Sequence, residues 1–488
     1  MSALNHRAAS LSASERRASR LALYLSLSCT LILFIDLSAR SITRWYSVHN
    51  QTFDLAFYMR IAWGLTEGDL WNPLVGASIW GLRISPVLYP LGELGRVFGM
   101  APTLLIAQAI AVAGAGWLMS RIVTRRFGVR WAWLGPLSWA LYPHLGHVAT
   151  YEFHPGTLAL LPFVWMIDAY DRSDARSFFW GAVGVILCRE DFTLILIAFG
   201  VMVAWTRADM RRVAALMITL SALWFLGFTL ILHPHYAPPQ GSMILHFGHW
   251  GATVPEALGF IITHPEQLWA HLTTSTRLFY LVMLTLPLSL TPLLSARWMV
   301  PILPTLAMNL LSQFPSTTGL DSHYLTPALP FLMVAGLEGL ASVCRVISER
   351  HPLLQLKVGR FTTRSCATTT LCVALWVTTL GVAHRYAGGT PLAVDYPASD
   401  FKGDVVTRHA REMMAQIAPH HSVQAPDRFT PHLATRAEIY RSKATPQAVD
   451  RLIIDRREPK HQHLREYAQR HGHLMMQRGR FELWTCRP

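Results

Sequence analysis

An acid flanked by aromatic residues stands in the first polar segment of this 488-residue chain, where Asp54 lies between Phe53 and Phe57. Aromatic rings stack on the faces of sugars, and a carboxylate accepts a proton from a hydroxyl group or binds a metal ion. The pattern is therefore suited to holding a sugar. The alternative is an aromatic belt at a membrane interface with a solvated acid.

Three consecutive ionisable residues, Arg189-Glu190-Asp191, interrupt an otherwise apolar stretch from Phe178 to Trp205. Charged groups are costly in lipid unless they are paired or face a polar cavity. If the stretch forms two short helices, the triplet lies in the turn between them; if it forms one helix, the charges are buried. Both arrangements favour a functional site, because a plain turn would more often use Gly, Asn or Ser.

Two further turns carry residues of the same kinds. Glu152 and His154 could bind a metal ion or a phosphate, although a capped, solvated turn is the commoner reason for such spacing. Asp321, His323 and Tyr324 place an acid, an imidazole and an aromatic ring at the start of an apolar segment. The alternative role of Asp321 is to cap the helix that follows.

Histidines and a membrane carboxylate form two weaker signals. The loop from 233 to 250 has histidines spaced H-x-H and H-x-x-H, without the acids or cysteines that would complete a zinc site. Glu338 lies within an apolar segment, where a carboxylate needs a partner or a cavity. We expect solvated loop histidines and assign no residue as a metal ligand.

The composition indicates that membrane helices position these groups. The mean hydropathy is +0.29, and hydrophobic residues make up 52% of the chain against 15% charged. This is more apolar surface than a soluble fold of this length buries. The excess of 43 Lys and Arg over 29 Asp and Glu lies largely in short turns, which indicates membrane topology and no nucleic-acid partner. The six cysteines show no C-x-x-C spacing, so no disulfide framework or cysteine metal site follows.

The apolar segments predict a polytopic α-helical membrane protein with about eleven spans, some of them short enough to be half-helices. We interpret the first segment as an uncleaved helix and Pro86 to Met100 as an interfacial or re-entrant helix. The predicted spans are 21–38, 101–120, 131–148, 156–170, 177–188, 191–206, 213–232, 278–295, 298–312, 325–344 and 365–384.

Basic residues gather in every second connection, beginning with the N-terminal segment 1–20, and this alternation places those connections in the cytoplasm. A large first loop, 39–100, and the candidate turns then lie outside the cytoplasmic (inner) membrane. The transmembrane domain extends over 21–386. The tail 395–488 alternates helix-like and strand-like stretches, including strands at 422–424, 451–455 and 480–485, and predicts a small soluble α/β domain outside the cell membrane.

The order of several motifs resembles the membrane protein family called domain of unknown function 2079. The likeness covers nearly the whole chain, including Pro431-His432-Leu433 near its end. That family is grouped with the GT-C superfamily of integral membrane glycosyltransferases, which use a lipid-phosphate-linked sugar and have an acid in the first outer loop as base or metal ligand. The motifs are Phe53-Asp54-Leu55, Ser85-Pro86, Glu152-x-His154-Pro155, Arg189-Glu190-Asp191 and Asp321-x-His323-Tyr324.

The resemblance implies that Asp54 is the catalytic base and that an arginine binds the donor phosphate through its planar fork. Family members often have Asp-Gln a turn after the first acid and His before Ser-Pro, where this chain has Met59-Arg60 and Arg83. Both differences add positive charge, which either favours a phosphate-bearing donor or marks a member that has lost catalysis. The implied substrate-binding residues are Arg83, Glu152, His154, Arg189, Glu190, Asp191, Asp321, His323 and Tyr324.

Three functions are compatible with these features. The first is glycosyl transfer from a polyprenyl-phosphate-linked sugar to an acceptor on the outer face, with retention or inversion left open. The second is a transporter or flippase of a lipid-linked or anionic solute, which inverted repeats would support; the sequence has no such repeat. The third is a non-catalytic assembly protein. The expected partners are a lipid-linked donor and membrane lipid, while a divalent cation and the oligomeric state stay open.

Overall fold

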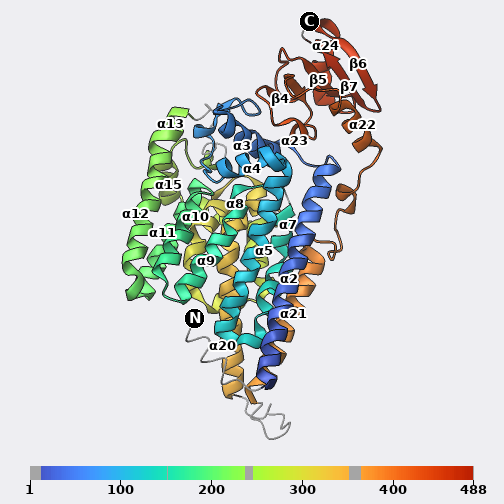
Figure 1. The fold of residues 1–488 in the computed structure, drawn as a ribbon. Coiled ribbons are helices and arrows are strands. Elements are labelled where there is room, and N and C mark those ends of the chain that lie inside the picture. The colour runs from blue at the N-terminus through green and yellow to red at the C-terminus, as the bar shows by residue number, and fades with distance from the viewer. Residues whose placement is uncertain (1–12, 151, 237–245, 351–363, 487–488) are drawn as a thin grey trace.

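The structure, a computed structural model, describes residues 13–150, 152–236, 246–350 and 364–486. A long helical body carries a small mixed α/β domain near one of its ends (Figure 1). Residues 1–12 of the predicted basic N-terminal segment, together with Tyr151, Lys357 and Arg360, lie outside the described residues.

Five helices in the described part of the chain are long and apolar enough to cross a membrane. Their spans have 21 to 30 residues, and a helix of about 20 residues crosses the hydrocarbon core. The structure is therefore that of a polytopic membrane protein. These helices are α2 (Ala13–Tyr46), α5 (Met100–Phe127), α12 (Arg211–Gly227) continuing through η6 (Phe228–Leu232) into α13 (His233–Tyr236), α20 (Leu329–Arg350) and α21 (Arg364–Ala387).

The other predicted spans are shorter or interrupted helices, and the count of eleven stays a prediction. The segment 131–148 is divided between two helices because Tyr142, which precedes Pro143, is extended. A short turn likewise separates two helices in the segment 156–170. The elements are η3 (Val129–Trp131), α6 (Leu134–Leu141), α7 (Pro143–Thr150), α8 (Pro155–Leu158), α9 (Leu160–Asp171), α10 (Ala175–Ile186), α11 (Thr193–Thr206), α17 (Ser275–Thr285), α18 (Ala296–Met299) and α19 (Leu303–Leu311).

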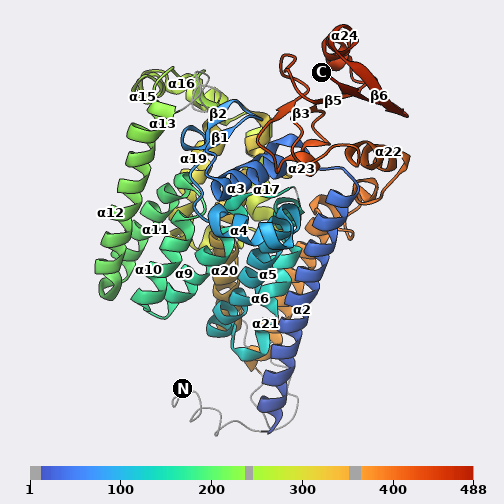
Figure 2. The ribbon, with the colours of Figure 1, turned by 45° about the horizontal axis from the view of Figure 1, so that its top comes forward.

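The first loop is a compact layer of short elements at the end of the body near the α/β domain (Figures 1 and 2). Its two longer helices pack closely, because Gly92 lets α4 approach the backbone of α3. A helix does occur where Pro86 to Met100 predicted one. The elements are η1 (Thr52–Ala56), α3 (Phe57–Glu67), β1 (Trp71–Asn72), β2 (Ala77–Ser78), η2 (Ile79–Gly81) and α4 (Leu88–Phe98).

Arginines and acids from several helices meet at the opposite end of the body. Arg126 on α5 pairs with Asp171 at 2.6 Å and with Glu338 on α20 at 3.7 Å, and Arg297 on α18 pairs with Glu338 at 2.6 Å. The carboxylate of Glu338 also accepts a hydrogen bond from Trp298 Nε1 at 2.9 Å. Glu338 therefore has the charged and hydrogen-bonding partners that a carboxylate in an apolar segment needs.

The C-terminal domain has a five-stranded sheet in the order β4-β3-β5-β7-β6. The first three strands are parallel, and β5, β7 and β6 are antiparallel. Strands occur at the three predicted places, whereas β4, which is only partly buried, and β6, which is largely exposed, were not predicted. The elements are α22 (Val405–Met414), β3 (Val423–Ala425), α23 (Thr430–Leu433), β4 (Ile439–Arg441), β5 (Arg451–Asp455), α24 (Gln462–His471), β6 (His473–Arg478) and β7 (Phe481–Thr485).

Candidate functional site

Asp54 lies in a strained turn within η1. Its backbone has φ 79° and ψ −94°, close to the rare γ-turn conformation that residues with a side chain seldom adopt. The carboxyl oxygens of Glu152 accept hydrogen bonds from the backbone N–H groups of Gln51 at 2.8 Å and Leu55 at 3.1 Å, on either side of Asp54. Glu152 therefore holds the turn in place from behind.

Burial controls the protonation of Glu152. Desolvation raises the pKa of this carboxyl to about 8, and the nearby charge of Asp54 acts in the same direction, while Arg44 and the two backbone N–H groups lower it. The side chain is buried behind the turn and lines neither of the cavities described below. The structure thus places Glu152 as a positioning residue for Asp54.

Gln108, on α5, fixes the turn that carries His154. Its Nε2 donates to the carbonyl oxygens of Ala149 at 3.0 Å and Glu152 at 2.6 Å, and its Oε1 accepts from the backbone N–H of His154 at 2.9 Å. Gln108 was not among the residues that the sequence indicated. The one feature of the sequence that could have indicated Gln108 is that it is the single amide in the apolar span 101–120. A buried amide in such a span is also common in ordinary helix packing.

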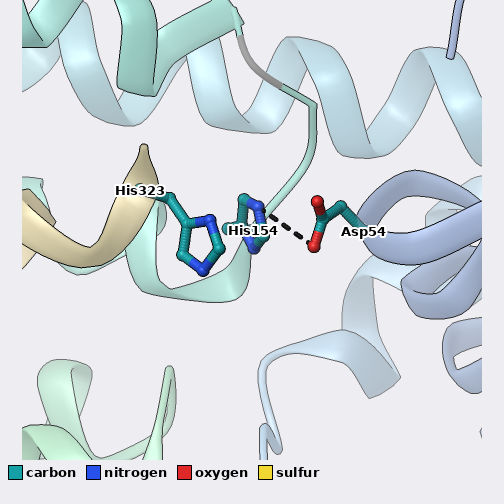
Figure 3. Close-up of side chains that lie close together, drawn as sticks. All are labelled: Asp54, His154 and His323. Atoms are coloured by element: carbon teal, nitrogen blue, oxygen red, sulfur yellow. Dashed lines mark ion pairs between the residues drawn. The ribbon is translucent and has the colours of Figure 1, made fainter. Parts of the chain in front are cut away.

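Asp54, His154 and His323 come together from three separate segments (Figure 3). His154 Nε2 lies 3.3 Å from Asp54 Oδ1. The imidazole rings of His154 and His323 stack at 3.7 Å between centroids with an interplanar angle of 24°. One ligand atom from each residue lies within 4.8 Å of the others, so the three side chains could together hold a metal ion.

Two arginines lie beside this group, each paired with one carboxylate. Arg83 donates to Glu190 at 2.8 Å, and Glu190 also accepts from the backbone N–H of Ile84 at 3.1 Å. Arg189 donates to Asp191 through Nε at 2.9 Å. Burial alone would lower the pKa of Arg83, but Glu190 and Asp191 outweigh it and hold that pKa above its usual value.

Arg189-Glu190-Asp191 occupies the turn between α10 and α11. The apolar stretch therefore forms two short helices, which is one of the two arrangements that the sequence allowed. The guanidinium of Arg189 lies over the ring of Phe192, 5.0 Å from its centroid. Gly156, at the start of α8, permits this placement, because an added Cβ would lie 2.9 Å from Arg189 Cδ. The close approach of α8 therefore fixes the position of this guanidinium.

A cavity of about 410 Å³ joins these groups, within the range of small-molecule sites. A second cavity of about 210 Å³ shares Arg83, Arg189 and Tyr324 with the first and is bounded by Phe225 and Phe228 of the α12 helix. The first cavity is lined by Phe53, Asp54, Phe57, Tyr58, Val75, Leu82, Arg83, His154, Arg189, Ser316, Ser322, His323 and Tyr324.

The structure brings most of the candidate residues to these two cavities. Glu190 and Asp191 line the second cavity only. Asp321 is exposed and lines neither, so the structure does not bring it together with the other candidates. His246, which we expected to be solvated, is partly buried and lines the second cavity.

The C-terminal domain contacts the turn that carries Asp54. Thr52 Oγ1 donates to Asp427 Oδ1 at 2.7 Å, and the guanidinium of Arg441 lies over the Phe53 ring, 4.2 Å from its centroid. Lys443 pairs with the other oxygen of Asp427 at 2.6 Å. The domain therefore bears directly on the cavity wall, a relation that the sequence did not indicate.

Membrane helices with a charged, aromatic-lined cavity at one end and a small α/β domain packed beside it define a polytopic membrane protein with a polar site. The family model described as "Predicted membrane protein (DUF2079)" matches residues 44–487, and the chain belongs to this family. The resemblance to the domain of unknown function 2079 family is thereby confirmed, while the grouping with GT-C glycosyltransferases stays a prediction. No curated protein matches the chain.

Proposed function

We propose that this protein is a membrane glycosyltransferase of the GT-C type that transfers a sugar from a polyprenyl-phosphate-linked donor to an acceptor hydroxyl. The observation that carries the proposal is the cavity in which the carboxylate of Asp54 faces the guanidinium groups of Arg83 and Arg189, with aromatic rings along the wall. A base, an anion-binding pair and sugar-stacking surfaces are the parts that such a transfer needs.

The second cavity suits the donor lipid. Phe225 and Phe228 belong to a helix whose neighbouring side chains are strongly exposed, Leu223 at 63% and Leu230 at 67%, as expected for a surface in contact with lipid. A polyprenyl chain lying along these phenylalanines would place its phosphate at Arg83 and Arg189. Guanidinium groups bind phosphate oxygens bidentately and are weakly hydrated, which suits a partly buried site.

The chemistry follows from the positions of these charges. Asp54 accepts the proton of the acceptor hydroxyl, and the acceptor oxygen forms a bond to the anomeric carbon of the sugar. The bond between that carbon and the phosphate oxygen breaks, and polyprenyl phosphate leaves with its negative charge facing Arg83 and Arg189. Fixed positive charges placed where the leaving group departs stabilise the charge that develops on it.

The distribution of arginines supports an outward-facing site. Arg125, Arg126, Arg297 and Arg345 line a cavity at the end of the body opposite the α/β domain. Basic residues favour the cytoplasmic side. We therefore infer that the N-terminus is cytoplasmic, and that the candidate site and the C-terminal domain lie on the outer face of the cytoplasmic membrane.

Replacing Asp54 by asparagine tests this function. Asp54→Asn keeps the size of the side chain and removes the base, and Asp395→Asn changes an exposed acid outside the site as a matched control. At equal membrane levels, transfer of labelled sugar from polyprenyl-phosphate donors should fall about 100-fold or more in Asp54→Asn and stay at the wild-type rate in Asp395→Asn. Equal transfer by wild type and Asp54→Asn would overturn the proposal.

A further inference from the structure

We infer that Asp54, His154 and His323 bind a divalent transition-metal ion, with zinc the best match to the donor set. The three residues come from η1, from the turn before α8 and from the start of η11 (His323–Ala328), and the side chain of His154 lies between those of Asp54 and His323 (Figure 3). Convergence of three such donors from distant parts of the sequence is a specific arrangement, because their ligand atoms all lie within 4.8 Å.

The chemistry of the donors selects the kind of metal. One carboxylate oxygen and two imidazole nitrogens suit zinc and its neighbours, whereas magnesium and calcium prefer sites built from oxygen alone. Zinc sites that take part in reactions use three protein ligands and keep one position open. Asp54, His154 and His323 supply three ligands, and they line a cavity with space beside them.

Groups behind two of the ligands hold them in place. Glu152 accepts hydrogen bonds on both sides of Asp54, and Gln108 accepts from the backbone N–H of His154. These hydrogen bonds fix the backbone of the two segments from which the ligands extend. The positive φ of Asp54 is a further sign, since strain in non-glycine residues concentrates at functional positions.

Two ion pairs limit the repulsion that the arginines of the cavity exert on a cation. Arg83 is paired with Glu190 and Arg189 with Asp191, so each acid offsets part of the positive charge of its arginine. The negative charge of Asp54 lies next to the imidazole of His154, on which the ring of His323 stacks. Asp54 would bind the ion through one carboxylate oxygen and keep the other to accept the proton of the acceptor hydroxyl. The charge of the ion would also lower the pKa of that hydroxyl, a role that rests on the proposed transfer reaction.

The test measures metal directly. Wild type, His154→Ala, His323→Ala and the control His249→Ala, which removes an exposed loop histidine, are purified without a polyhistidine tag. Metal is counted by mass spectrometry, and cobalt is added in place of zinc to record visible absorption. We expect about one metal ion per chain in wild type and His249→Ala, and a loss of at least about tenfold in occupancy and cobalt absorption in the two ligand variants.

Thermal unfolding separates loss of metal from loss of folding. Zinc should raise the melting temperature of wild type and His249→Ala, because a ligand that binds the folded state stabilises it, and should leave that of His323→Ala unchanged. Wild type without metal, without cobalt absorption and without a zinc-dependent shift would overturn the inference. So would ligand variants that bind as much as wild type. Bound metal in a protein that transfers no sugar would refute the proposed function alone.

Discussion

Replacing Glu152 by alanine tests whether this residue holds the strained turn of Asp54. The change removes the acceptor of the backbone N–H groups of Gln51 and Leu55, which lie 2.8 and 3.1 Å from its oxygens. A buried donor left without its acceptor costs about 1–3 kcal/mol, so the pair costs roughly 2–6 kcal/mol. The strained backbone of Asp54 costs of the order of 1–3 kcal/mol. Without the hydrogen bonds to Glu152 nothing offsets this cost, so the backbone should relax and move the Asp54 side chain away from the cavity.

Thermal unfolding in detergent and sugar transfer at matched protein levels measure the two consequences of this change. Glu152→Ala should lower both the melting temperature and the transfer rate. Glu152→Gln keeps one acceptor oxygen and should give intermediate values. Glu466→Ala, which removes an exposed acid on α24, is the control. If Glu152→Ala matches Glu466→Ala in both measurements, Glu152 does not hold the turn and the reasoning fails.

Three further predictions follow from single contacts. Arg83→Lys keeps the charge but loses the planar fork, so the KM for the donor should rise about tenfold, equivalent to about 1.4 kcal/mol; an unchanged KM in a donor titration would contradict this. In Gly156→Ala the new Cβ would lie 2.9 Å from Arg189 Cδ, so the same titration should show weaker donor binding in a folded protein, and wild-type values would count against the role of Arg189. Burial lowers the pKa of His432 to about 4 from 6.5. Because this folded-state pKa is depressed, the stability that neutral His432 contributes, up to roughly 3 kcal/mol, is present above pH 6.5 and lost as the pH falls toward 4. The melting temperature should therefore fall between pH 7 and 4.5, and by less in His432→Phe; equal slopes would refute the assignment.

Long apolar segments made the membrane helices predictable, because lipid requires continuous apolar side chains and internally satisfied backbone groups. The helix breaks were harder to predict. The division at Pro143 follows from the restriction that proline places on the preceding residue, Tyr142, yet the same segment is long enough for one span. In the C-terminal domain, the buried strand Arg451–Asp455 was predicted, whereas the largely exposed His473–Arg478 carried no comparable pattern.

The candidate site was predictable where charge interrupts an apolar sequence, as at Arg189-Glu190-Asp191. The spatial organisation of the site could not be predicted from the sequence, because its contacts join residues that are far apart in the chain. Gln108 reaches His154 across 46 residues, and Asp427 reaches Thr52 across 375. The positive φ of Asp54 depends on the backbone contacts that Glu152 supplies, which sequence patterns do not record.

Release of polyprenyl phosphate is the most direct test of the central claim, because a transferase must break the bond between the sugar and the phosphate. Wild type and Asp54→Asn are reconstituted in proteoliposomes with a donor labelled in its lipid and a mixture of acceptors. We expect labelled polyprenyl phosphate from wild type and about 100-fold less or none from Asp54→Asn. Donor that crosses the bilayer or stays bound while remaining intact would contradict it and would favour a transporter.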